Sequence, residues 1–159
     1  MVAIAYNWWK LLHILGVLGF VTFHGVSIWV ALRLRRERDR VRVAELLQFS
    51  GSSVQGMYVS LGVLILFGVI AGFAGTWWGQ WWIWMALLIL LAMIAEMTAV
   101  ARPYYQRVKE AVEVRPSGVP RRSDEELDEI LRSRLALVNA VLGVVALVVL
   151  VWLMVFKPF

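Results

Sequence analysis

Four apolar runs, each long enough to cross a membrane, dominate the pattern of hydrophobic and polar positions along the chain. They fall at about residues 10–33, 56–76, 81–101 and 135–156. A helix needs roughly 20 mostly apolar residues to span about 30 Å of hydrocarbon. The pattern therefore predicts an all-α polytopic membrane protein, a bundle of four transmembrane helices. The whole chain, residues 1–159, is expected to form a single membrane domain.

Polar residues concentrate in two connections, at residues 34–55 and 102–134. All Lys and Arg apart from Lys10 and Lys157 lie in or directly beside these two segments, and the short connection before Trp81 has none. Because positively charged loops stay on the cytoplasmic side, we expect both basic loops inside and both termini outside (N-out, C-out). The basic charge is thus a topology signal. It predicts no nucleic-acid partner, since no base-reading module accompanies it.

Tryptophans mark the other ends of the same helices. Indole prefers the interface between lipid and water, where its apolar body and its N–H are both satisfied. The first run has no cleavage site after it and its positive charges follow rather than precede it, so it does not resemble a cleavable signal. We expect a multi-pass protein of the bacterial cytoplasmic (inner) membrane. The tryptophans that map to the outer helix ends are Trp8, Trp9, Trp77, Trp78, Trp81, Trp82 and Trp152.

The two basic connections contain local signals of their own. The first predicts an extension of the first helix, then an amphipathic stretch at Val43–Phe49 that rests on the membrane surface, then a break at Gly51-Ser52-Ser53. In the second connection, Pro103 predicts an end or a kink of the third helix. Ser123-Asp124-Glu125-Glu126 is a capping box, which predicts the start of a helix that runs into the fourth span.

Three ionisable residues lie inside the apolar runs: His13 and His24 in the first, and Glu96 in the third. An ionisable group in hydrocarbon costs roughly 2.5–3.5 kcal/mol even on insertion scales, so it needs a partner, a cavity or a cofactor. His13 and His24 are the only histidines of the chain. Their spacing of 11 residues puts both on one helix face, about 16 Å apart along the axis.

The third run repeats this spacing, because Met85 and Glu96 are also 11 residues apart. Counted inward from the outer tryptophans, Met85 falls at about the depth of His13, and Glu96 at about the depth of His24. We therefore predict two levels in the bundle. His13 and Met85 form the outer level, and His24 with Glu96 as its buried polar partner forms the inner one.

These levels admit several chemistries. A neutral imidazole is a good axial ligand for haem iron, bundle cores are where cofactor sites form, and Gly16 on the histidine face leaves room for a flat macrocycle. Haem b, with His13, His24 and Met85 as candidate ligands, is the cofactor that we predict. The same residues can instead fix helix register, or handle protons, a metal or a small solute. Met93 and Met97 add a weak Cu(I) signal.

The two histidines are too far apart on one helix to ligate the same iron. A six-coordinate haem then needs a second ligand from another helix, such as Met85, or from another copy of the chain. In a parallel two-fold homodimer, each histidine would lie at the depth of its symmetry mate. The lipid bilayer, and a homodimer or a larger membrane complex, are therefore the partners that we expect.

Several functional classes have no support in the sequence. The absence of cysteine excludes disulfides, thiolate metal sites, iron–sulfur clusters and covalently attached haem. There is no nucleophile triad, phosphate loop or HExxH motif, so nothing indicates a hydrolase or an NTPase.

Short motifs at both ends carry a family resemblance. The segment Trp9-Lys10-Leu11-Leu12-His13-Ile14 resembles the opening of small four-helix bacterial membrane proteins: the HemJ-type protoporphyrinogen oxidases, the membrane domain of CopD copper-resistance proteins, and related membrane proteins of unknown function. The ending Val155-Phe156-Lys157-Pro158-Phe159 is similar to the Lys-Pro-Phe tail of the HemJ type. The resemblance implies that His13 is a b-haem ligand.

The chain departs from that family in its third span. The HemJ type uses a lysine there, whereas this sequence has none between Trp81 and Ala101, where Glu96 is the only charge. Catalytic oxidase activity is therefore not expected. We predict b-type haem binding with a redox or electron-transfer role. The alternative is a cofactor-free membrane protein, either a subunit of a larger complex or a transporter of copper or a small solute.

Overall fold

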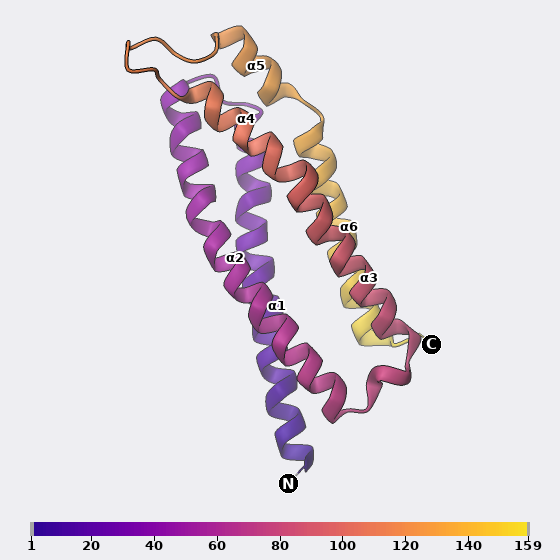
Figure 1. Ribbon diagram of the computed structural model, residues 1–159. Helices are drawn as coiled ribbons and strands as arrows, with labels where there is room; N and C mark the ends of the chain where they lie inside the picture. Colours follow the sequence, from indigo (N-terminus) through magenta and orange to yellow (C-terminus); the bar gives the residue numbers. More distant parts are fainter. Residues whose placement is uncertain (1, 159) are drawn as a thin grey trace.

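The computed structural model describes residues 2–158, and long helices make up most of this range (Figure 1). Within this range the sole β feature is an isolated bridge between Val114 and Pro120. The all-α fold predicted from the sequence is confirmed. The elements are α1 (Val2–Leu34), α2 (Arg40–Ala74), η1 (Trp77–Gly79), α3 (Trp81–Glu96), η2 (Met97–Ala101), α4 (Arg102–Val112), α5 (Asp124–Arg132) and α6 (Leu135–Phe156).

Four helical stretches are long and apolar enough to span a bilayer: Ile4–Leu34, Arg40–Ala74, Trp81–Val112 and Asp124–Phe156. Large apolar side chains point outward along their middles, for example Leu91, whose exposed fraction is 63%. Such a surface is stable only when lipid covers it. The protein is therefore an integral membrane protein with four helices that span the lipid bilayer, as predicted.

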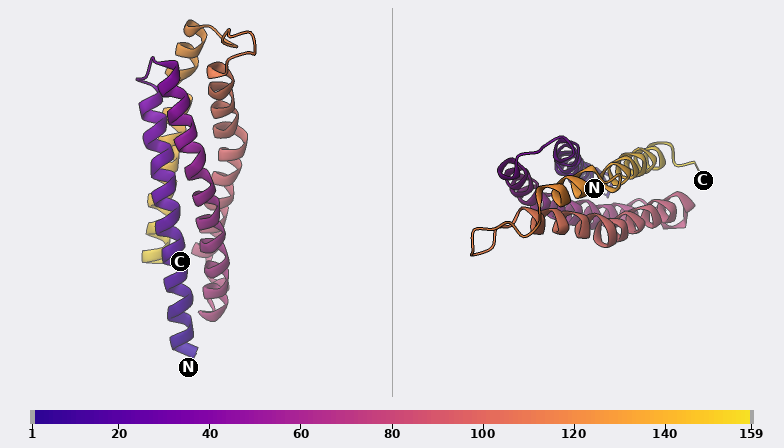
Figure 2. Two further views of the ribbon diagram at one scale, coloured as in Figure 1. Left: turned by 90° about the vertical axis from the view of Figure 1, so that its left-hand side faces the viewer. Right: turned by 90° about the horizontal axis from the view of Figure 1, so that it is seen from above.

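The helices form two antiparallel pairs, α1 with α2 and α3 with α6 (Figure 2). The α1–α2 pair is close because Gly16 faces the α2 backbone. A Cβ at Gly16 would come within 2.6 Å of the Leu64 nitrogen. The expected space for a macrocycle beside Gly16 does not exist, because the backbone of α2 fills it.

Helix α2 begins well before the apolar run that predicted it. The side chain of Asp39 caps it by accepting the N–H of Val41 (2.8 Å). The stretch Val43–Phe49 is not a surface segment but part of α2, and Gly51-Ser52-Ser53 does not interrupt the helix. The physical reason is tertiary packing: Val43 is fully buried, so the apolar face that predicted contact with the membrane surface instead contacts the protein core.

The five-residue turn η2 joins α3 to α4 as a π-helix directly before Pro103. Proline has no N–H, and its ring clashes with the carbonyl four residues earlier in an α-helix. One widened turn removes that conflict without ending the helix. The helix does not end at Pro103, as one of the two predicted outcomes required, and the π-helical turn is the irregularity that accommodates the proline.

The predicted capping box is also confirmed. The Glu126 N–H donates to Ser123 Oγ (3.2 Å), and the Ser123 N–H donates to Glu126 Oε2 (3.0 Å). The helix that it starts does not run into the fourth span, however, because Ser133 has an extended ψ of 136° and separates α5 from α6. At this break the Ser133 carbonyl has no partner within its own helix. It accepts a hydrogen bond from the guanidinium of Arg35, near the end of α1 (2.6 Å).

A compact core closes the basic end of the molecule, where α1, α2, α4 and α5 meet. Polar contacts surround it: Arg40 pairs with Asp124 (2.5 Å) and Arg38 with Asp128 (2.9 Å). In the α1–α2 connection, the carboxylate of Glu37 accepts the N–H groups of Asp39 and Arg38, and these bonds lower the pKa of Glu37. The largest fully buried side chains of this core are Val30, Leu34, Val43, Val108 and Leu131.

Aromatic side chains gather at the opposite end of the molecule, around Trp77 of η1. The Trp77 indole N–H donates to the Tyr6 hydroxyl (3.3 Å), and its ring meets Trp82 edge-on. The Lys157 ammonium lies over the Trp77 ring at 4.0 Å, an arrangement that its left-handed φ of 46° allows. Both termini lie away from the end that carries the two basic connections (Figure 1). Which end faces the cytoplasm stays a prediction from the charges.

Candidate functional site

A cleft of about 1050 Å³ lies between the two helix pairs, toward the basic end. Its walls come from α1 and α2 on one side and from α3, η2, α4 and α6 on the other, and they are mostly apolar. A volume of this order is at the upper end for small-molecule and cofactor sites, roughly 300–1000 Å³. The polar or sulfur-bearing side chains that line it include His24, Ser27, Gln48, Met57, Tyr58, Met93, Glu96, Met97, Arg102, Tyr105, Lys109 and Asn139.

His24 is held in this cleft by its neighbours rather than by hydrogen bonds. Phe20, one turn earlier on α1, stacks on the imidazole with 5.5 Å between ring centroids. The Nε2 edge lies against Gly143 of α6, where a Cβ would come within 2.6 Å of Nε2. Nδ1 is buried and has no hydrogen-bond partner among the described residues. A buried ring nitrogen without a protein partner is costly, so we expect a water molecule or another polar group beside it.

Glu96 lines the same cleft at the end of α3, directly before the π-helical turn. The structure thus brings His24 and Glu96 to one cavity, as the predicted inner level requires. No hydrogen bond or ion pair joins the two side chains within residues 2–158, and Nδ1 of His24 and Oε1 of Glu96 are each left without a partner there.

The lining becomes charged toward the basic end. Arg102 and Lys109 of α4 border the cleft there, beside Gln106, together with one carboxylate, Glu113, directly after the helix. Tyr105 ties this wall to α1 by donating its hydroxyl to the Ser27 carbonyl (3.3 Å). The sequence identified these cations only as topology signals, because no spacing rule shows which loop arginines and lysines turn back toward the bundle.

His13 lies outside the cleft, at the α1–α2 contact. Its Nδ1–H donates to the Leu64 carbonyl (2.7 Å), and the ring covers Gly68, where a Cβ would come within 2.9 Å of Nδ1. This bond leaves Nε2 as the ring nitrogen with a lone pair. Met85 does not line the cleft either, and its exposed fraction is 42%. The predicted outer level is therefore not assembled around one cavity.

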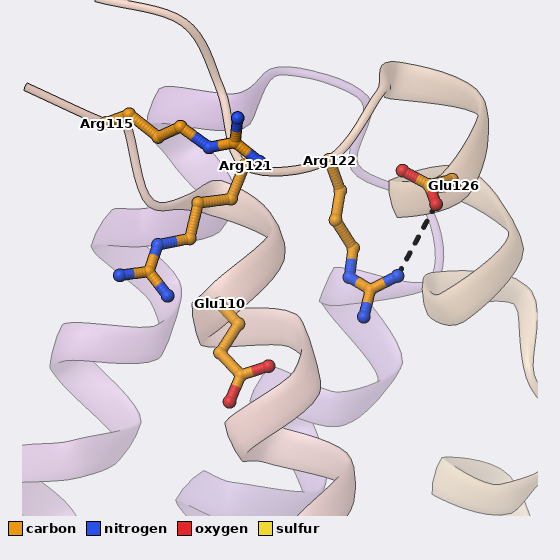
Figure 3. A pocket seen from close by; sticks show the side chains of 5 residues that line it. All are labelled: Glu110, Arg115, Arg121, Arg122 and Glu126. Atoms are coloured by element: carbon orange, nitrogen blue, oxygen red, sulfur yellow. Dashed lines mark hydrogen bonds and ion pairs between the residues drawn. The ribbon is translucent and has the colours of Figure 1, made fainter. Parts of the chain in front are cut away.

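A smaller polar pocket of about 210 Å³ lies where α4, the following loop and α5 meet (Figure 3). Two of its three arginines have acidic partners: Arg122 pairs with Glu126 (3.4 Å) and Arg121 with Glu113 (3.3 Å). Such exposed pairs are typical of a solvated surface. Nowhere in the described range do three His, Cys, Asp or Glu gather as a metal-binding group.

Fold and cleft together define an integral membrane protein that spans the bilayer four times and holds ionisable side chains between its helix pairs. The chain matches the family described as "Predicted integral membrane protein (DUF2269)" over residues 8–158, and it belongs to that family. The matched region includes every helix that lines the cleft. No curated protein and no solved structure matches the chain.

Proposed function

We propose that this chain binds haem b in the cleft, with His24 as an axial ligand, and serves electron transfer in a bacterial cytoplasmic membrane. The observation that carries the proposal is the His24 imidazole, whose buried Nδ1 lacks a partner in a large, mostly apolar cavity. Bound haem would supply one-electron chemistry between its two iron oxidation states.

The lining of the cleft fits haem, which has an apolar macrocycle and two charged propionate groups at one edge. Apolar side chains such as Ile28, Leu47 and Val54 can enclose a flat macrocycle, while Arg102 and Lys109 border the basic end. Carboxylates pair with Arg and Lys through charge-assisted hydrogen bonds. Arg102 and Lys109 would therefore hold the propionates and orient the group across the bundle.

The resemblance to the HemJ and CopD group favours haem as well, although it implies His13 as the ligand. We assign the cleft haem to His24, because His24 lines the cleft whereas His13 lies outside it. In this proposal His13 ties α1 to α2. The third span contains no lysine, so we propose electron transfer rather than catalysis.

A second candidate is Cu(I) binding at the same cleft. Met57, Met93 and Met97 line it together with His24, and thioether and imidazole ligands suit Cu(I). The sulfur content of the cleft is the observation that favours this candidate.

The absorption spectrum of the purified protein, expressed with sufficient haem supply, separates the two candidates. We expect a Soret band and, after reduction, a sharp α band. A colourless protein that retains stoichiometric copper in detergent would support the second candidate and overturn the first. A protein with neither cofactor, both as purified and after titration with haem and with Cu(I), would contradict both.

A further inference from the structure

One histidine leaves the second axial position of a six-coordinate haem to another residue of the cleft. We infer that the Met93 thioether of α3 fills this position, so that both ligands come from one chain. The inference rests on the proposed function and adds the identity of the second ligand, in place of the sequence-based candidates Met85 and a second copy of the chain.

The second ligand has to come from the wall opposite His24. His24 is on α1, and Met57 belongs to the same α1–α2 wall: a Cβ at its neighbour Gly56 would come within 2.5 Å of the Phe23 ring on α1. Met57 therefore lies beside His24 rather than across from it. Met93 lines the cleft from α3, in the other helix pair.

The depth of Met93 also agrees with that of His24. Trp82, Ala86 and Leu153 form one buried cluster, which fixes the register between the antiparallel helices α3 and α6 to within about one turn. Eleven residues along α3 from Trp82 lead to Met93, and ten residues back along α6 from Leu153 lead to Gly143. At about 1.5 Å of rise per residue, Met93 and Gly143 therefore lie within about one turn of the same level. The His24 ring lies against Gly143, which puts Met93 and His24 at similar depths.

The other candidates on this wall fit less well. Met97 follows Met93 by one turn and belongs to the π-helical η2, nearer to the basic end. Glu96 offers a hard carboxylate, whereas thioether sulfur and imidazole are established haem ligands. Met93 is thus the soft donor at the right depth.

Ligation by His24 and Met93 would link the two helix pairs through the cofactor. It would also raise the reduction potential relative to ligation by two imidazoles, since a histidine–methionine pair favours ferrous haem. The assigned role is therefore that of an electron carrier with a comparatively high potential.

The test compares the haem-loaded wild type with Met93→Leu and Met93→His by near-infrared absorption and redox titration. We expect the wild type to show the ferric sulfur-to-iron charge-transfer band, and Met93→Leu to lose that band while it keeps its haem through His24. Met93→His should stay low-spin, without the band and with a lower potential. Met85→Leu, outside the cleft, and Met97→Leu are the matched controls, and both should keep the band.

The outcomes separate this inference from the proposed function. If Met93→Leu keeps the band, or if Met97→Leu loses it instead, the assignment of Met93 is wrong, while haem binding through His24 stands. If the wild type binds haem but never shows the band, methionine ligation is wrong. If the wild type binds no haem, the proposed function itself fails.

Discussion

At the scale of single residues, the two histidines differ in what their ring nitrogens contact. Nδ1 of His13 donates to a backbone carbonyl of α2, whereas Nδ1 of His24 is buried and has no partner among the described residues. Their sequence contexts are nearly alike, since both lie in the same apolar helix. The hydrogen bond of His13 joins α1 to α2, whereas the His24 side chain lines the cleft.

Gly143 tests how tightly His24 is positioned. Gly143→Ala would place a Cβ 2.6 Å from Nε2, so the imidazole or α6 must shift. We expect a loss of about 1–3 kcal/mol in stability, typical of overpacking, and a changed haem spectrum. Gly25→Ala on α1 is the matched control, because its Cβ would meet nothing within 4 Å. Equal denaturation midpoints in detergent for the two variants would contradict the described His24–Gly143 contact.

The sequence identified the ionisable residues but not their partners. Helical periodicity and the tryptophan belt predicted His24 and Glu96 at one depth, and the structure places both side chains along one cleft. The bond from His13 to Leu64 could not be predicted, because a backbone carbonyl carries no signal in residue identity. That Arg102 and Lys109 line the cleft could not be predicted for a different reason. Their charges support the predicted topology equally well whichever way their side chains point.

At the scale of elements, the apolar runs and local signals predicted the helices better than their ends. The capping box at Ser123 and the helical irregularity before Pro103 depend on neighbouring residues alone, and both are present. The start of α2 at Arg40 depends on contacts with distant segments. An amphipathic stretch has the same pattern whether its apolar face meets lipid headgroups or a protein core, so sequence periodicity could not separate these two settings.

The α1–α2 pair depends on close backbone approach at Gly16. Gly16→Ala would bring a Cβ within 2.6 Å of the Leu64 nitrogen and push the helices apart at the His13 bond. We expect a loss of about 1–3 kcal/mol, measured as a lower denaturation midpoint in detergent. Gly62→Ala on α2 should be neutral, since its Cβ would meet nothing within 4 Å. Tolerance of both substitutions would argue against the described packing.

The cap of α5 allows a local test. Ser123→Ala removes the acceptor for the Glu126 N–H, so α5 should lose about 1 kcal/mol of local stability. Amide hydrogen exchange within Asp124–Arg132 should become faster, while exchange in α6 stays unchanged. Ser117→Ala, in the exposed preceding loop, is the control and should leave α5 as it is. Unchanged exchange in the Ser123 variant would contradict the role of the capping box.

At the scale of the whole molecule, the structure separates a basic, ion-paired end from an aromatic one. This separation agrees with the predicted orientation, in which the basic connections face the cytoplasm. The cleft lies toward the basic end, so a cofactor held there would exchange electrons with partners on that side of the membrane.

The orientation can be measured by cysteine labelling, since the chain has no cysteine of its own. Ser117→Cys and Gly79→Cys lie at opposite ends, and both positions are exposed. We expect an impermeant thiol reagent applied outside intact cells to label position 79, and to label position 117 only after the membrane is opened. Labelling of both positions from the same side would refute the four-span topology.

The central claim is that His24 holds haem in the cleft, and the haem content per chain tests it most directly. Wild type, His24→Ala and His13→Ala should be purified side by side, with gel filtration used to confirm that each variant is folded, and assayed as pyridine haemochromogen. Because a substitution at His24 can disturb packing, His24→Gln serves as a second variant that keeps a polar side chain. We predict that both His24 variants fall to background haem, whereas His13→Ala keeps the wild-type content. Wild-type haem content in the folded His24 variants, with loss in His13→Ala, would contradict the account and make His13 the ligand.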